Sequence, residues 1–147
     1  MKYLIALISL FAAHMAFAYP LEMQSCRDAG VSSDSVTDTR AWSNGQIKLF
    51  VHDVGEPVNQ PVGIRIVYDR FVGQVNQQRF CVYVRGLSDA SLQSAVAQYD
   101  EPTNTLYIQV PARRYFGDAD RFGATTATFV IRKEGRLATD IFSASVR

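Results

Sequence analysis

The sequence predicts an all-β protein: an antiparallel β-sandwich, or a partly open barrel, of about seven strands with one disulfide. Three observations support this. Apolar and polar residues alternate with a period of two through most of the chain, clusters of Gly, Pro, Asn and Asp separate the alternating segments, and two cysteines follow an export-type N-terminus. Strands joined by short turns bury their apolar faces only in a second layer or a closed barrel, which gives the expected architecture.

The N-terminus has the features of a cleaved signal peptide. Lys2 precedes an apolar stretch from Tyr3 to Ala18 that ends in Ala-Phe-Ala, the small-x-small pattern that signal peptidase accepts. The stretch is shorter than the roughly 20 residues that span a membrane. We therefore expect residues 1–18 to be a signal peptide and residues 19–147 to be a single secreted domain, periplasmic or extracellular, without a transmembrane segment.

The charge balance and the cysteines indicate which kinds of ligand and which cellular compartment are expected. After removal of Lys2, fourteen basic residues face fourteen acidic ones, and this balance argues against a nucleic-acid binder. Cys26 and Cys81 are expected to form a disulfide, because exported chains fold in an oxidising compartment. Closing a loop of that length stabilises a fold by about 4 kcal/mol in the chain-entropy model.

The expected strands follow one another along the chain. The alternating segments are residues 46–54, 62–69, 79–86, 104–112, 123–133 and 136–146. Glu134 and Gly135 fit a two-residue hairpin between the last two, since glycine accepts a positive φ. Residues 88–99 allow a helix, but the turn-like sequence after them favours a strand over 94–100. Residues 32–40 form a polar stretch ahead of the first strand.

The alternation in residues 79–86 predicts on which face of the sheet the disulfide lies. Its pattern puts Phe80, Val82 and Val84 inward, and Cys81, Tyr83 and Arg85 outward. The disulfide would then hold the N-terminal segment across the outside of a sheet, with Tyr83 and Trp42 beneath it.

The order Cys26, Trp42, Cys81 superficially resembles the immunoglobulin framework, in which a tryptophan packs on an intersheet disulfide. Arg79 stands where that framework has a tyrosine, two residues before the second cysteine. At least four strand segments also follow Cys81, where the framework leaves one. A sandwich of different topology is therefore expected.

Few residues suggest catalysis. His52 is the one histidine after the signal peptide, and it is expected to be a polar residue at a strand end. No G-x-S-x-G elbow or glycine-rich phosphate loop is present. Asp118 and Asp120 form a close acidic pair, and they could act as a hydrolase pair or hold calcium. The calcium-loop pattern lacks its fifth-position oxygen ligand and its terminal Glu. No other cofactor is expected.

Residues 112–124 are predicted to be an exposed loop and the best candidate for a binding surface. The candidate ligand-binding residues are Arg113, Arg114, Tyr115, Phe116 and Arg121. Guanidinium groups bind carboxylates bidentately and stack on aromatic rings, so an anionic glycan or a protein with an acidic patch would fit. Alternatively, the arginines pair with Asp118 and Asp120, and the segment is only a connection.

We therefore expect an exported, non-catalytic binding protein of the bacterial envelope or extracellular space. One alternative is a protein inhibitor or envelope assembly subunit that acts through a loop or an edge strand. A second is a small hydrolase that uses Asp118 and Asp120.

Overall fold

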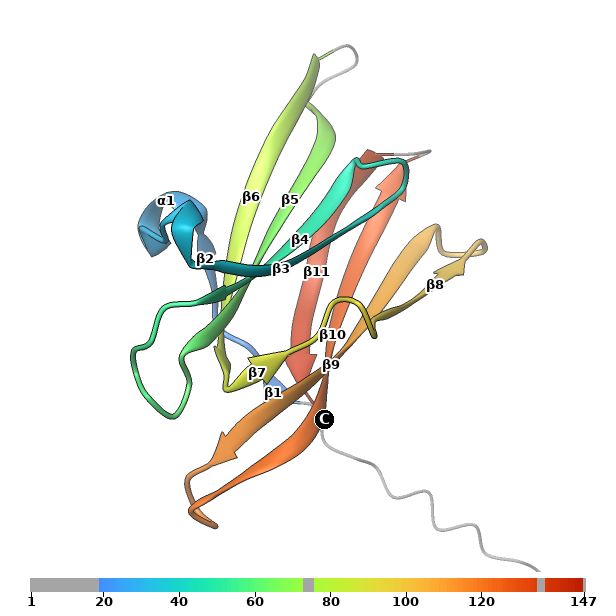
Figure 1. Ribbon diagram of the computed structural model, residues 1–147. Helices are drawn as coiled ribbons and strands as arrows, with labels where there is room; N and C mark the ends of the chain where they lie inside the picture. Colours follow the sequence, from blue (N-terminus) through green and yellow to red (C-terminus); the bar gives the residue numbers. More distant parts are fainter. Residues whose placement is uncertain (1–18, 73–75, 135–136, 147) are drawn as a thin grey trace, which may run out of the picture.

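The computed structural model describes residues 19–72, 76–134 and 137–146, and it confirms an all-β fold of antiparallel sheets (Figure 1). The predicted signal peptide, residues 1–18, lies outside the described residues. The elements are β1 (Tyr19–Pro20), β2 (Met23–Ser25), α1 (Cys26–Ala29), the 3-10 turn η1 (Ser33–Ser35), β3 (Val36–Trp42), β4 (Ile47–Asp53), β5 (Val62–Val72), β6 (Asn76–Leu87), β7 (Asp89–Ala90), β8 (Val96–Asp100), β9 (Thr105–Phe116), β10 (Arg121–Glu134) and β11 (Leu137–Val146). In this part of the chain no helix is long and apolar enough to cross a membrane.

Each sheet is mainly a meander of consecutive strands. One has the order β2-β6-β5-β4-β3; the other has the order β1-β11-β10-β9-β7, with β8 also paired to β9. The last two strands pair as predicted, with Glu134 opposite Leu137, while the turn residues 135–136 lie outside the described part. The strand preferred over 94–100 is confirmed as β8, and residues 91–95 form the turn before it.

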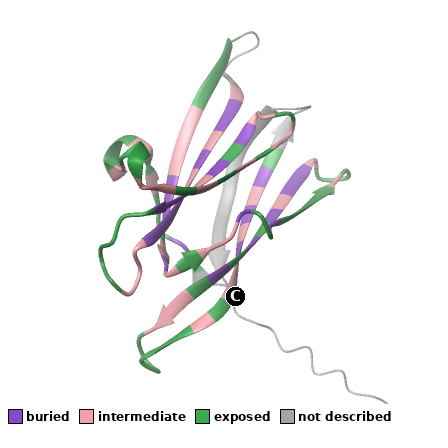
Figure 2. Ribbon diagram, in the orientation of Figure 1, coloured by how far each residue is buried: buried purple, intermediate pink, exposed green. Residues whose placement is uncertain are grey.

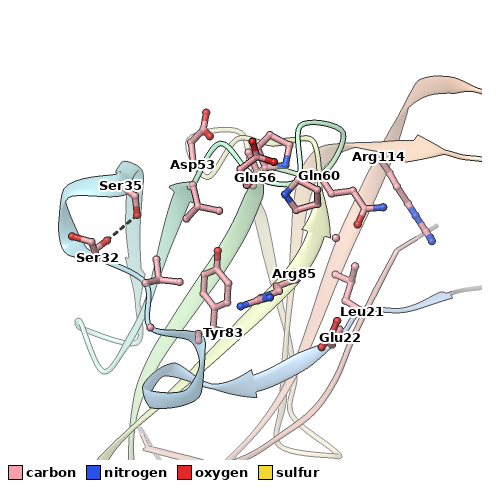
Figure 3. A pocket seen from close by; sticks show the side chains of 18 of the residues that line it. Leu21, Glu22, Ser32, Ser35, Asp53, Glu56, Gln60, Tyr83, Arg85 and Arg114 are labelled. Carbon is pink, nitrogen blue, oxygen red and sulfur yellow. Dashed lines mark hydrogen bonds between the residues drawn. The ribbon is translucent and has the colours of Figure 1, made fainter.

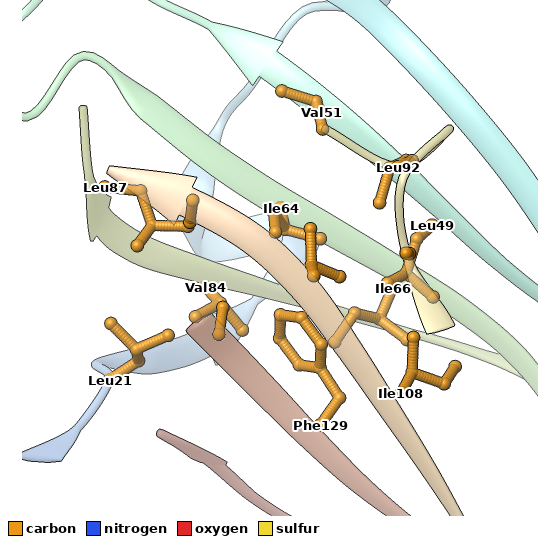
Figure 4. Packing of buried hydrophobic residues seen from close by; sticks show 14 of the residues in the cluster. Leu21, Leu49, Val51, Ile64, Ile66, Val84, Leu87, Leu92, Ile108 and Phe129 are labelled. Atoms are coloured by element: carbon orange, nitrogen blue, oxygen red, sulfur yellow. The ribbon is translucent and has the colours of Figure 1, made fainter. Parts of the chain in front are cut away.

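The core lies between the inner faces of the two sheets. Ile64 and Ile66 of β5 and Val84 of β6 surround Phe129 of β10 from the opposite sheet (Figure 4). In Figure 2 the buried positions alternate with exposed ones along the strands, as a period of two requires. Burial of each large apolar side chain contributes about 1.5–3 kcal/mol, so this alternation is the main source of stability.

The segment that contains β1 and β2 joins the two sheets along one side. Tyr19 and Pro20 pair with β11, and three residues later β2 pairs with β6 of the other sheet. Leu21, between the two short strands, is buried in the core. The chain from Tyr19 onward therefore closes this side of the sandwich.

The opposite side is closed by polar contacts between β3 and the turn at residues 91–95. Arg40 donates from Nη1 to the backbone oxygens of Leu92 (3.0 Å) and Ala95 (2.7 Å). Asp38 accepts from the backbone N–H of Leu92 at 2.8 Å. Burial alone would raise the pKa of Asp38, but hydrogen bonds from the Gln93 side chain and from the backbone N–H groups of Leu92 and Thr39 hold that pKa below its ordinary value.

The sequence indicated only a polar stretch over residues 32–40, and the edge strand β3 at residues 36–42 was missed. The strand looks polar in sequence because Asp38 and Arg40 bind the turn at 91–95 rather than core side chains. Trp42 was also misplaced. It lies opposite Ile47 and packs against the main core, with the Arg40 guanidinium 5.2 Å from its ring centre.

The predicted disulfide between Cys26 and Cys81 is confirmed, with the Cα atoms 5.4 Å apart. Cys26 begins α1 directly after β2, and Cys81 lies in β6, so both belong to the same side of one sheet. The bridge fastens the N-terminal segment to the outer face of β6, as expected, and does not link the two sheets.

Candidate functional site

The predicted loop over residues 112–124 is instead a β-hairpin. Strand β9 continues to Phe116, β10 begins at Arg121, and only residues 117–120 form the turn. Aromatic side chains stabilise the extension, because Tyr115 and Phe122 are cross-strand partners with ring centres 5.3 Å apart. The hairpin projects beyond the sandwich, at the lower left of Figure 1.

The hairpin divides the candidate binding residues between its two faces. Arg114, Phe116 and Arg121 share one face, where the Phe116 ring lies about 6 Å from each guanidinium carbon and covers Gly123. Arg113 and Tyr115 lie on the other face, and both Arg113 and Arg121 are exposed. The structure therefore does not bring all five residues to one cleft.

Asp118 and Asp120 are exposed in the turn of this hairpin. Asp120 has a left-handed backbone, φ 45°, and its carboxylate accepts from the Tyr115 hydroxyl. That carboxylate raises the pKa of Tyr115. Within the described residues, no three His, Cys, Asp or Glu side chains gather into a possible metal site.

A pocket of about 840 Å³ opens where the N-terminal segment, the 54–61 loop, β6 and the base of the hairpin meet (Figure 3). Arg114 is the one candidate binding residue that lines it. The other charged residues of its lining are Glu22, Asp34, Asp53, Glu56 and Arg85. Its volume lies in the range of small-molecule sites.

Arg85 lines this pocket from the outer face of β6, directly before a β-bulge. Its outward position follows from the alternation of β6, because Val84 before it faces the core. Between β5 and β6, Ile64 pairs with Val84 and Val62 with Leu87, so Arg85 and Gly86 together oppose Gly63. Gly86 has φ 104°, a conformation that glycine adopts without strain. The extra residue returns Leu87 to the core.

Polar contacts from two elements hold Arg85 in place. With its amide oxygen turned toward the guanidinium, Gln24 of β2 accepts from Arg85 Nε at 2.7 Å and from Nη2 at 2.8 Å. The Arg85 backbone N–H donates to the backbone carbonyl oxygen of Glu22 at 3.1 Å. The guanidinium carbon lies 5.9 Å from the centre of the Tyr83 ring. The cation at the pocket wall is therefore positioned in advance of any ligand.

Tyr83 forms the buried part of the pocket wall. It was correctly placed on the outer face of β6, but only 2% of it is exposed, because the N-terminal segment covers it. Gly63 makes room for the ring, since a Cβ at that position would lie 2.1 Å from the Tyr83 hydroxyl oxygen. Burial raises the pKa of Tyr83 against the opposing effect of Arg85, so the phenol stays protonated at neutral pH.

His52 lies at the end of β4, as predicted, but it is fully buried, which the sequence did not indicate. Its ring packs edge-on against Tyr83, with the centres 5.9 Å apart. Burial, and then the charge of Arg65, hold the pKa of His52 below its ordinary value. The imidazole is therefore neutral near pH 7.

His52 and Ser35 form a hydrogen bond that fastens η1 to β4. Ser35 Oγ lies 2.7 Å from His52 Nδ1 and 2.8 Å from the Ser32 backbone oxygen. The tautomer of the imidazole sets which atom of the Ser35–His52 pair is the donor.

The sequence reasoning missed this pocket although one signal was present. Gly86 interrupts an otherwise regular strand pattern, which often marks a bulge. The contributions of Gln24 and Glu22 gave no such signal, because they depend on the N-terminal segment pairing with β6. Comparison of the chain with protein-family models, with curated proteins and with solved structures gives no match.

Proposed function

We propose that this protein is an exported, non-catalytic binding protein of the bacterial envelope or extracellular space that holds an anionic glycan in the Arg85 pocket. The observation that carries the proposal is the fixed Arg85 guanidinium, held by Gln24 at the pocket wall. A guanidinium that is already oriented loses little side-chain entropy when it binds a carboxylate or a sulfate.

The rest of the lining suits a hydroxyl-rich anion better than a simple one. Asp53 and Glu56 stand on the loop side of the pocket and offer acceptors for sugar hydroxyls (Figure 3). These carboxylates disfavour a ligand that is anionic throughout, because like charges repel. Arg114 lines the pocket from the hairpin and supplies a second cation. A sugar acid, with one carboxylate and several hydroxyls, matches this mixed charge.

Titration calorimetry with oligosaccharides that carry a single uronic acid residue, and with the neutral oligosaccharides of otherwise identical composition, tests this proposal. We expect the acidic oligosaccharides to bind more tightly, and their affinity to fall with added salt. Arg85→Gln should weaken binding by about 10- to 150-fold, the cost of a charge-assisted hydrogen bond.

Arg132→Gln is the matched control, because Arg132 is exposed on β10 and does not line the pocket. It should bind like the wild type. Equal affinity of Arg85→Gln and the wild type would refute the proposal, as would failure of every acidic oligosaccharide to bind.

A second candidate function, a protein inhibitor or assembly subunit, is favoured by apolar side chains beside this pocket. Val58 at the tip of the 54–61 loop is 77% exposed and Phe122 of the hairpin is 47% exposed; both line a shallow depression with Arg113. A stoichiometric protein complex that survives gel filtration and is lost in Val58→Asp, but not in Arg85→Gln, would support this function instead.

A further inference from the structure

Strand β8 is an edge strand whose outer side pairs with no other strand among the described residues. Its inner side pairs with β9, where Ala97 lies opposite Ile108 and Tyr99 opposite Leu106. Ile108 and Leu106 face the core, so Ala97 and Tyr99 lie on the core side of the sheet. Figure 1 shows β8 at the margin of the molecule, well away from α1.

Within the described part of the chain, the second sheet does not extend over the core-side face of β8. That sheet ends at β3, which closes on residues 91–95, directly before β8 begins. Tyr99, on the core-side face, is 45% exposed. Val96, on the other face beside Gln109, is 62% exposed. Figure 2 shows most of β8 as exposed.

Soluble proteins usually protect such an edge. The common devices are an edge Lys, a Pro, a bulge or an inward-pointing charge, each of which prevents another strand from pairing. The β8 sequence, VAQYD, contains no Lys or Pro, and its pairing with β9 has no bulge. Its one charge, Asp100, is at the strand end. The edge therefore retains the geometry of a strand that can take a partner.

We propose that two copies of the chain associate through β8, which pairs antiparallel with β8 of the second copy about a two-fold axis at Gln98. This register is self-complementary. Ala97 of each copy faces Tyr99 of the other on the core side, so the small side chain leaves room for the ring. Tyr99 is already oriented, because its hydroxyl donates to the Asn104 side chain.

The charges of the chain allow a second copy to pair with β8. In this register Asp100 of each copy lies opposite Val96, and the two Asp100 residues are about 13 Å apart along the strands. That separation exceeds the screening length of roughly 8 Å at physiological salt. The chain from residue 19 onward has equal numbers of acidic and basic residues, so the two copies do not repel through net charge. A five-residue strand pair is a small interface, so we expect a weak dimer whose population rises with protein concentration.

Such a dimer leaves the Arg85 pocket of each copy accessible, because the pocket is built from the N-terminal segment, β6 and the 54–61 loop rather than from β8. If the proposed function holds, the dimer presents two glycan sites and binds a polymeric ligand more tightly than a monomer does. The dimer itself does not rest on the proposed function, and it is tested without any ligand.

Sedimentation velocity of the purified protein over a concentration series, with no saccharide present, is the test. We expect a monomer–dimer equilibrium for the wild type. Gln98→Lys places two like charges directly opposite each other at the two-fold axis and should leave a monomer at all concentrations. Gln109→Lys is the matched control: Gln109 is exposed in the same sheet, on β9, and should dimerise like the wild type.

A cysteine variant tests the same β8–β8 pairing independently. Gln98→Cys should form an intermolecular disulfide under mild oxidation, because directly opposed residues have Cβ atoms about 4.5–5.5 Å apart. Gln109→Cys should not. A wild type that stays monomeric at every concentration overturns the proposal. So does a dimer that persists in Gln98→Lys, or one that Gln109→Lys abolishes equally.

Discussion

Substitution of Gly63 by Ala tests the geometry that forms the buried wall of the pocket. The added Cβ would lie 2.1 Å from the Tyr83 hydroxyl oxygen, 2.3 Å from Cζ of the same ring and 2.8 Å from the Val84 backbone oxygen. Atoms in van der Waals contact need about 3.5 Å, so the ring would have to move by more than 1 Å. The contact with Val84 involves the backbone, which cannot relax by a rotamer change.

The magnitude follows from the two ways in which the protein can respond. If the ring stays, overpacking costs about 1–3 kcal/mol. If the ring turns out into the pocket, Tyr83 loses burial that contributes about 1.5–3 kcal/mol. The two responses together give a loss of about 1–3 kcal/mol in the free energy of unfolding, or roughly 4–12 °C in Tm for a domain of this size.

Urea unfolding followed by the fluorescence of the single tryptophan, Trp42, measures this loss. Gly117→Ala is the control, because its Cβ would meet nothing closer than Tyr115 Cε1 at 3.6 Å. In the Tyr83→Ala background the methyl group enters vacated space, so Gly63→Ala should cost about 1–2 kcal/mol less than in the wild type. Equal costs in the two backgrounds would show that the ring does not occupy the space above Gly63.

Three further predictions concern stability. Replacing Cys26 and Cys81 together by Ser should lower the free energy of unfolding by about 4 kcal/mol, measured by urea unfolding; an unchanged midpoint would contradict the role of the disulfide. The pKa of His52 is below its ordinary value of 6.5 in the folded chain, so below that pH the unfolded chain takes up a proton that the native chain does not. Stability should therefore fall on acidification from pH 6.5, by up to about 1.4 kcal/mol per pH unit, and His52→Gln should lack this component of the slope; identical slopes would exclude His52 as its source. Arg40→Gln should cost about 2 kcal/mol and speed amide exchange at residues 91–95, while unaltered exchange there would show that Arg40 does not hold the turn.

The sequence by itself determined most of the long strands and the disulfide. Alternation is a local property, because successive side chains of any strand point to opposite faces whatever the strand pairs with. Residues such as Ile64, Ile66 and Val84 therefore show their inward orientation in the sequence alone. Tyr83 was likewise placed correctly on the outer face of β6.

Only the tertiary structure decided what covers each outer face, and so which polar residues are buried. His52 has the pattern of an exposed residue, yet η1 and Tyr83 enclose it. Residues 36–42 do not alternate clearly in sequence because Asp38 and Arg40 bind a turn more than fifty residues away. Such contacts depend on how distant segments meet, which no local pattern records.

The pocket shows most clearly which features the sequence indicates and which only the tertiary structure decides. The alternation of β6 alone placed its central cation, Arg85, on the outer face, and the bulge after it returns Leu87 to the core. Gly86 indicated a break in the strand, but the sequence could not show that Gln24 would meet Arg85 there. The hairpin at residues 112–124 attracted attention by its composition, and pairing then placed its arginines on two faces, with Arg114 lining the pocket. Composition is read along the chain, whereas a site is formed by the side chains that the fold brings to one place.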